Sequence, residues 1–189
     1  MTAHALMFVD KPTFYRFVAE AESGYRYEYV RGWIMQQQAG GTFNHARLGA
    51  RFAAVLERQL DPQIWAVTGA DRGIDTGDTV RYADTVVEKL GAPADSLATE
   101  APWLIVEVLS PSSEERDLAT KPVEYLGLQS LQAYIVARHD EPLCYVWLRN
   151  ANGAFAPAPL VVKGRDQSMQ ISALSATIDL AEVYRGIGE

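Results

Sequence analysis

The stretch "APWLIVEVLSPSSEERDLATK", residues 101–121, decides the fold class and raises the main chemical question. Its apolar run from Trp103 to Leu109 predicts a strand with two buried faces, because apolar side chains occupy both sets of alternating positions. Glu107 lies inside this run. An ionised carboxylate in such a place is costly unless it is paired, hydrogen-bonded or bound to a metal. Glu107 therefore needs a partner, and a structural Arg or Lys is as reasonable a partner as a metal ion.

The segments around this strand predict one domain of α/β (α+β) class with a central mixed β-sheet flanked by helices. The chain has 189 residues, enough to close one sizeable core. We expect a core over about 14–150 and a strand and helix extension over 151–189. The expected helices are 12–20, 44–60 and 112–128, the expected hairpin is 25–37 with its turn at Arg31 and Gly32, and the expected strands are 63–69, 79–90, 102–110, 131–138 and 143–148.

Composition excludes several classes of protein. The chain has 17 Lys and Arg and 24 Asp and Glu, so its formal charge is -7. This charge argues against a protein whose whole surface binds nucleic acid, but a local basic patch is compatible with it. Cys144 is the one cysteine, which excludes a disulfide scaffold and a cysteine-based zinc site. The N-terminal residues lack the pattern of a signal peptide, and no apolar run approaches the ~20 residues of a membrane span. We expect a cytoplasmic protein without membrane contact.

A second acidic residue lies in the strand expected just upstream. In "TVRYADTVVEKL" (79–90), strict alternation places Asp84 between Tyr82 and Val86 on one face. Neighbouring strands that aim an Asp and a Glu at one point form an oxygen site suited to Mg²⁺, with water and substrate phosphate in the remaining positions. Asp84 and Glu107 together therefore predict phosphodiester chemistry. An ordinary aspartate at a strand edge is the alternative for Asp84.

The helix expected after the strand of Glu107 carries a lysine that faces back toward it. Ser112 and Glu115 match the S-x-x-E capping box, so the helix is predicted to open directly after the strand. Asp117 and Lys121 are four residues apart on one helix face. Lys121 is placed to reach the acidic pair, whereas a surface ion pair with Asp117 is its alternative. Pro122 predicts a kink or break at this lysine.

The long helix predicted over 44–60 carries polar residues beside its apolar face. Arg47, Arg51 and Arg58 form a stripe that could contact a nucleic-acid backbone, or that simply faces solvent. His45 projects onto the apolar side, where it either approaches a substrate or packs between helix and sheet.

An acid on one strand, a Glu on the next and a nearby Lys resemble the PD-(D/E)XK nuclease superfamily. The chain is similar, more closely, to a large bacterial family of restriction-endonuclease-like proteins, many of them catalogued as domains of unknown function. The similar segments are "YEYVRGWIMQ" (27–36), "NHARLGARFAAVLERQL" (44–60), "RYADTVV" (81–87), "PWLIVEVLSPSSEERDLATKPVEYLGL" (102–128) and "AYIVAR" (133–138).

The resemblance implies a role for each matching position. Asp84 and Glu107 would bind Mg²⁺ or Mn²⁺, Lys121 would act as the motif lysine, and Glu28 would match an N-terminal catalytic acid. An edge-strand glutamate is the alternative for Glu28. Leu109 stands where the simplest form of the motif has its lysine, and Ala83 stands where a proline precedes the aspartate.

The function predicted from these features is a metal-dependent endonuclease that hydrolyses DNA phosphodiester bonds. The resemblance also implies a homodimer, since cutting two strands calls for two sites. The alternative is a catalytically weak or inactive nuclease-fold protein that binds nucleic acid or serves in assembly, which the acidic net charge and Pro122 favour. The sequence contains neither a phosphate-binding P-loop nor a GxSxG elbow, so nucleotide-driven and serine-based chemistry is not predicted.

Overall fold

The computed structural model describes residues 4–21, 25–38, 41–109 and 116–188. The helical elements are α1 (Lys11–Glu20), α2 (Phe43–Gln59), a π-helical turn (Arg116–Thr120), α3 (Lys121–Tyr125), a 3-10 turn (Ser172–Leu174) and α4 (Leu180–Val183). The strands are β1 (His4–Phe8), β2 (Tyr25–Val30), β3 (Trp33–Gln38), β4 (Trp65–Thr68), β5 (Gly73–Asp75), β6 (Thr79–Tyr82), β7 (Thr85–Lys89), β8 (Ala98–Thr99), β9 (Pro102–Leu109), β10 (Ala133–Arg138), β11 (Leu143–Leu148), β12 (Leu160–Lys163), β13 (Ser168–Ile171) and β14 (Ala176–Asp179).

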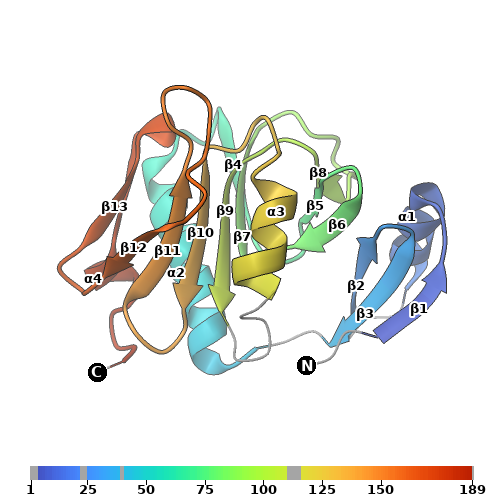
Figure 1. Ribbon diagram of the computed structural model, residues 1–189, viewed down its shortest axis with the longest axis horizontal. Helices are drawn as coiled ribbons and strands as arrows, with labels where there is room; N and C mark the ends of the chain where they lie inside the picture. The colour runs from blue at the N-terminus through green and yellow to red at the C-terminus, as the bar shows by residue number, and fades with distance from the viewer. Residues whose placement is uncertain (1–3, 22–24, 39–40, 110–115, 189) are drawn as a thin grey trace.

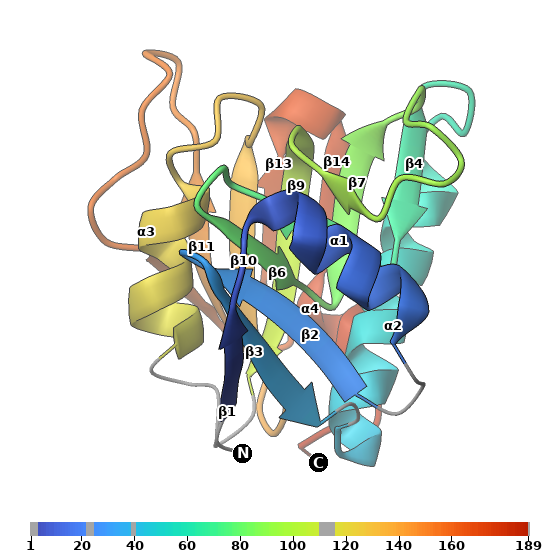
Figure 2. The ribbon, with the colours of Figure 1, turned by 90° about the vertical axis from the view of Figure 1, so that its right-hand side faces the viewer.

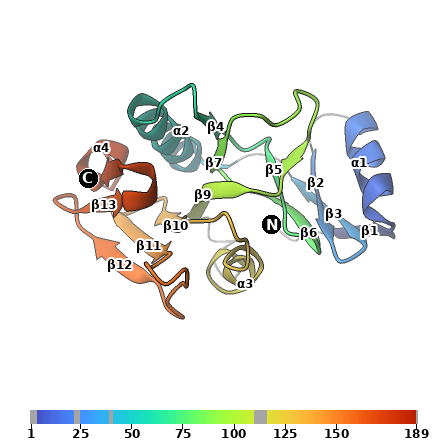
Figure 3. The same ribbon diagram turned by 90° about the horizontal axis from the view of Figure 1, so that it is seen from above.

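A six-stranded sheet, here called the central sheet, runs in the order β12-β11-β10-β9-β7-β4. The pair of β10 and β9 is parallel and the other pairs are antiparallel, so the predicted mixed sheet is confirmed. Figure 3 shows α2 and α3 on opposite sides of β9, which makes this strand the middle layer of the fold. None of the described helices is long and apolar enough to cross a membrane.

Helix α2 packs on one face of the central sheet through its apolar stripe. The helix begins after Thr42, whose side-chain oxygen accepts a hydrogen bond from the His45 amide at 3.3 Å and so caps the helix N-terminus. Leu48 and Phe52 are fully buried against Leu104 and Val106 of β9. Burying each such side chain stabilises the fold by roughly 1.5–3 kcal/mol. This contact fixes α2 beside the end of the sheet that carries the acidic residues.

The predicted hairpin opens a second six-stranded sheet, here called the N-terminal sheet, in the order β1-β3-β2-β6-β5-β8. Its turn residues Arg31 and Gly32 have φ of 48° and 94°, the pattern of a type I′ turn that matches the twist of the two strands. Figures 1 and 2 show this sheet and α1 (blue) set beside the central sheet. The first hairpin thus builds a separate sheet, which the sequence did not predict.

The expected strand over 79–90 is wrong, because the chain divides at Ala83 and Asp84. β6 before this point belongs to the N-terminal sheet, whereas β7 after it belongs to the central sheet. Alternation counted through the division predicts the wrong side for Asp84, since the two strands do not share one pleated surface. Asp84 lies at the junction of the two sheets.

The C-terminal residues belong to the main core. β12 extends the central sheet through β11, and the hairpin of β13 and β14 packs with α4 beside α2. Met169, Ile178 and Tyr184 are buried in the same cluster as Phe52. The hairpin of β13 and β14 and helix α4 therefore complete the α2 side of the sheet, as Figure 1 shows at its left edge.

Candidate functional site

Glu107 and Lys121 form a buried ion pair on the α3 side of β9. Ile105 and Leu109, two residues on either side of Glu107, are buried in the cluster that contains Tyr125 of α3. Lys121 Nζ lies 2.5 Å from Glu107 Oε1, and the two side chains are 3% and 5% exposed. The same ammonium group donates to the Tyr82 carbonyl oxygen at 3.4 Å. The buried carboxylate thus has the cationic partner that its position requires.

A change of helix type places Lys121 at this point. The chain forms a π-helical turn over Arg116–Thr120 and then an α-helix that begins at Lys121, with Pro122 in its first turn. Proline is tolerated there, because an amide in the first turn has no α-helical acceptor. At Pro122 the chain thus stays helical from Arg116 to Tyr125, and a change from π-helix to α-helix stands where a kink or break was predicted. Lys121 remains in contact with Glu107. The predicted capping box, Ser112 and Glu115, lies outside the described residues.

Asp84 sits in a local irregularity between β7 and β9. Its amide donates to the Val106 carbonyl oxygen at 3.1 Å, and Thr85 is also paired with Val106. Two consecutive residues opposite a single residue form a β-bulge, a feature that re-aims side chains next to active sites. The Asp84 carboxylate then accepts a hydrogen bond from the Val108 amide at 2.7 Å. Asp84 is thereby fixed to the residue that follows Glu107.

The bulge turns Asp84 toward α2. His45 Nε2 lies 3.5 Å from Asp84 Oδ2, and a Cβ placed on Gly49 of the same helix would lie 3.4 Å from the Asp84 Cβ. The next residue, Thr85, donates its hydroxyl to the Gly49 carbonyl oxygen at 3.2 Å. Simple alternation predicted that Asp84 lies on the same face as Val86, and this prediction is wrong. Asp84 approaches the end of β9 from the α2 side, whereas Glu107 approaches from the α3 side.

The donor types of Asp84 and Glu107 fit Mg²⁺ or Mn²⁺. Mg²⁺ is commonly held by one or two protein carboxylates and keeps water or phosphate oxygens in its other positions. Within the described ranges, no three His, Cys, Asp or Glu side chains gather into a closed metal cage. The donors available here are the carboxylates of Asp84, which directly precedes β7, and of Glu107 in the neighbouring strand β9.

Glu28 belongs to a neighbouring buried network. Its side chain is 3% exposed and accepts from Arg81 Nη1 at 2.8 Å. Arg81 also donates to both carboxylate oxygens of Glu124, at 2.9 and 2.8 Å. Burial alone would lower the pKa of Arg81, but hydrogen bonds and charges from Glu124 and Glu28 raise it well above its usual value. The network ties β2 and β6 to α3, the helix of Lys121.

Tyr125 lies close enough to both ionic groups to feel their charges. It is completely buried, and burial together with the charges of Glu107 and Glu28 raises its pKa well above the usual value. No described residue forms a hydrogen bond with its hydroxyl group. The neutral Tyr125 side chain therefore packs near Glu107 and Lys121 and places one polar group, its hydroxyl, inside the site.

The three arginines predicted as a nucleic-acid contact have partners in the C-terminal segment. Arg47 donates to the Gly186 carbonyl oxygen at 3.0 Å, and Arg51 donates to that of Val183 at 3.1 Å. Arg58 pairs with Glu182 of α4 at 2.9 Å. These contacts hold the end of the chain against α2, and contact of these arginines with nucleic acid stays a prediction.

A groove of about 330 Å³ opens beside Asp84. Arg26 of β2 and His45 of α2 contribute its basic side chains. The remaining lining consists of glycine and alanine: Gly41, Ala46, Gly49, Ala50, Ala53, Gly69 and Ala70. We call this the Arg26–Asp84 groove.

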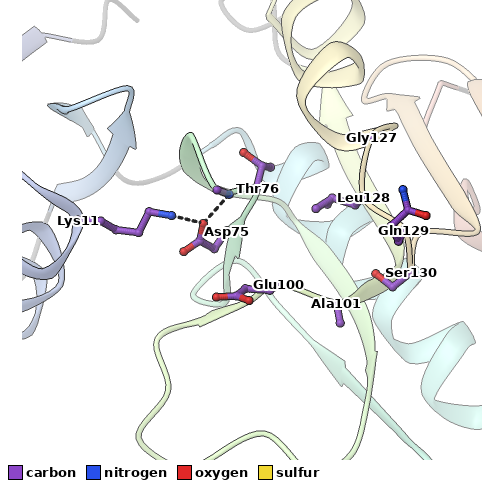
Figure 4. A pocket seen from close by; sticks show the side chains of 10 residues that line it. Lys11, Asp75, Thr76, Glu100, Ala101, Gly127, Leu128, Gln129 and Ser130 are labelled. Carbon is purple, nitrogen blue, oxygen red and sulfur yellow. Dashed lines mark hydrogen bonds and ion pairs between the residues drawn. The ribbon is translucent and has the colours of Figure 1, made fainter.

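A second cavity, of about 470 Å³, lies between α1, the end of β5 and the loop after α3 (Figure 4). Its charged groups are largely engaged with each other, since Lys11 Nζ lies 2.7 Å from Asp75 Oδ1 and the Gly77 amide donates to the same oxygen at 2.8 Å. The residues that line it include none of Asp84, Glu107 and Lys121. It is therefore a separate feature of the molecule.

Sequence patterns missed Arg81 and Glu124 as part of the buried ionic region. The available signal was the helix after β9, where Glu124 follows Lys121 at three residues and Tyr125 follows it at four, so both share its side of the helix. Their partner Arg81 comes from the N-terminal sheet, which the sequence did not predict.

Comparison with known proteins adds an independent line of information. A solved structure described as a putative nuclease belonging to DUF820, from Anabaena variabilis, superposes with a TM-score of 0.72 at 16% identity, over 89% of this chain and 95% of that one. An uncharacterized protein of Synechocystis sp. is 27% identical over 165 residues, which cover 86% of this chain and 85% of the relative. The model of the Uma2 family, described as "Putative restriction endonuclease", matches residues 12–181. The chain therefore belongs to the Uma2 family of restriction-endonuclease-like proteins.

Proposed function

We propose that this protein is a metal-dependent endonuclease that hydrolyses phosphodiester bonds of DNA. The observation that supports it most is the contact of Lys121 Nζ with Glu107 Oε1 at 2.5 Å, next to the position where Asp84 meets the backbone of Val108. Two carboxylates and a lysine at the end of two paired strands are the groups that metal-assisted phosphate hydrolysis needs. Membership of the Uma2 family, whose description is that of a restriction endonuclease, points to the same reaction.

Asp84 and Glu107 would hold the ion, Mg²⁺ or Mn²⁺. When bound, such an ion polarises the phosphate and lowers the pKa of a coordinated water. The protein's own contribution is to fix the two carboxylates. The Val108 amide orients Asp84, and the burial of Glu107 keeps bulk water from competing for its oxygens.

Lys121 supplies the positive charge of the site. Glu107 and the Tyr82 carbonyl oxygen both accept from its ammonium group, so the group is held in one place. A fixed cation beside the reacting phosphate stabilises the negative charge that develops in the transition state. His45, 3.5 Å from Asp84, is placed to orient that carboxylate from the α2 side.

A nuclease-fold binding protein without hydrolytic activity is the second candidate. The observation that favours it is the deep burial of both Glu107 and Lys121 in an ion pair with each other. We also propose that the protein acts as a homodimer, since two strands require two sites, and the molar mass in solution by light scattering tests this independently.

Incubation of supercoiled and linear DNA with the protein and Mg²⁺ or Mn²⁺ tests the proposed reaction. We expect the wild type to nick or linearise the DNA, whereas Asp84→Asn and Glu107→Gln lose at least about 100-fold, the scale of removing one electrostatic group from an active site. Asp61→Asn, at an exposed position after α2, is the charge-matched control and should cut like the wild type. Equal rates for the wild type and the two site variants would refute the hydrolytic function and leave the binding protein.

A further inference from the structure

The walls of the Arg26–Asp84 groove come from three parts of the chain. Arg26 lies near the beginning of β2, His45 and the small residues lie along α2, and Asp84 lies at the β-bulge. The groove thus connects the surface with the α2 side of Asp84, one of the two proposed metal ligands.

The floor of the groove carries almost no side-chain bulk. Seven of the ten lining residues are glycine or alanine. Gly69 has open space around it, since a Cβ added there would meet nothing within 4 Å, and Ala50 is exposed on α2. A volume of about 330 Å³ with such walls lets a bulky backbone lie close to the protein main chain. Apolar ligands usually require larger hydrophobic side chains around them, and these are missing from the lining.

The Arg26 side chain of the groove is suited to bind an anion. The Arg26 guanidinium carbon lies 5.5 Å from the centre of the Tyr82 ring, which positions the side chain by a cation–π contact. Its nearest acidic partner, Asp71, is 4.0 Å away and fully exposed to solvent, so that pair is weak. The planar guanidinium can therefore bind a phosphate with two parallel hydrogen bonds.

We propose that the Arg26–Asp84 groove binds a phosphodiester of the DNA strand next to the bond that is cut, with Arg26 as the phosphate contact. This inference rests on the proposed function and specifies how its substrate is held. The glycine and alanine floor lets the sugar-phosphate backbone reach Asp84, and it offers no side chain long enough to read a base edge. Binding at the groove is therefore independent of base sequence.

The first test removes the charge of the groove. The probes are fluorescein-labelled single-stranded and duplex DNA of two unrelated sequences, titrated in Ca²⁺, with anisotropy as the readout. We expect Arg26→Ala to raise Kd at least about tenfold for both sequences, as loss of a charge-assisted phosphate contact would. The slope of log K against log salt should fall by about 0.9 on duplex and about 0.7 on single-stranded DNA. Arg16→Ala removes the same charge from α1, outside the groove, and should leave Kd and slope as in the wild type.

The second test fills the groove without changing charge. Ala50 and Ala54 are both exposed on α2, but Ala54 does not line the groove. Leucine is a good helix former, so neither Ala50→Leu nor Ala54→Leu should unfold the helix. We expect Ala50→Leu to weaken DNA binding at least tenfold and Ala54→Leu to have no effect. Circular dichroism melting of both variants checks that the fold is retained.

The outcomes separate this inference from the proposed function. If Arg26→Ala and Ala50→Leu bind both DNA forms like their controls, or if the wild type binds neither form, the groove assignment is wrong. Metal-dependent cleavage by the wild type that is lost in Asp84→Asn would then still support the nuclease. Conversely, weaker binding by both groove variants in a protein that cuts no DNA would keep the groove and refute the hydrolytic function.

Discussion

Lys121 Nζ lies 2.5 Å from Glu107 Oε1, and the two side chains meet between the first residue of α3 and the buried strand β9. This contact gives the single carboxylate inside an apolar strand a partner of opposite charge. It also brings a lysine to the acidic residues from a helix, although Leu109 occupies the strand position two residues after Glu107. Both properties depend on the π-helical turn that precedes Lys121.

Glu107→Gln should destabilise the protein by about 3 kcal/mol, because it leaves the Lys121 ammonium buried without its counter-charge. Urea unfolding followed by circular dichroism measures the change. Glu107→Gln combined with Lys121→Met should recover part of the loss, since no buried charge remains. Additive losses in the double variant would mean that the two groups are not coupled.

Arg81→Met should cost about 3–5 kcal/mol, because Arg81 bridges the buried carboxylates of Glu28 and Glu124. The matched control is Arg58→Met, since Arg58 pairs with Glu182 at a position where 59% of its side chain is exposed. That pair should contribute less than about 1 kcal/mol. Similar losses of unfolding free energy in the two variants would contradict a structural role for the buried network.

Two substitutions at Gly49 test whether the position of Asp84 matters for activity. A Cβ at Gly49 would lie 3.4 Å from the Asp84 Cβ, an ordinary contact, so Gly49→Ala should retain DNA cleavage and gain up to about 1 kcal/mol of stability from helix propensity. Gly49→Val adds two methyl groups at this contact and should displace Asp84. We expect its cleavage rate to fall at least tenfold while the fold persists. Full activity in Gly49→Val would show that the position of Asp84 is not critical.

The buried carboxyl of Asp75 makes the stability of the fold depend on pH. Burial opposes its ionisation, but hydrogen bonds from Lys11, the Gly77 amide and Tyr15 lower the carboxyl pKa below the usual 3.8. Because the folded pKa is the lower one, this stabilisation is present above pH 3.8 and is lost as the pH falls through the folded value.

Lys11→Met should therefore raise the pKa of Asp75, measured by carbon-13 NMR titration of the carboxyl group, and reduce the loss of stability in acid. Lys163→Met, at an exposed pair with Glu141, is the control and should leave Asp75 unchanged. An Asp75 pKa that is the same in the wild type and in Lys11→Met would refute the contribution of Lys11.

The elements fixed by local chemistry were predictable from the sequence. The hairpin turn at Arg31 and Gly32, the Thr42 cap of α2 and the buried strand of Glu107 each follow from residues close together in the chain. An irregularity of the helix at Pro122 followed in the same way, because proline acts on its own turn of helix, although it takes the form of a change of helix type and not of a break.

The features that depend on distant segments could not be predicted. Alternation assumes one continuous strand, so it could not detect that the chain leaves one sheet at Tyr82 and enters another at Thr85. The bulge that turns Asp84 toward His45 depends on pairing with Val106. The backbone acceptor of Arg51 lies more than 130 residues away, so the sequence could not show that Arg51 also holds the C-terminal segment.

The position of a bound Mn²⁺ ion in crystals of the protein, located by anomalous diffraction, tests the shared metal site most directly. We predict one ion at about 2.1 Å from a carboxylate oxygen of both Asp84 and Glu107, with water in the remaining positions. An ion bound to Asp84 and His45 alone, with Lys121 still on Glu107, would contradict a metal shared by the two carboxylates.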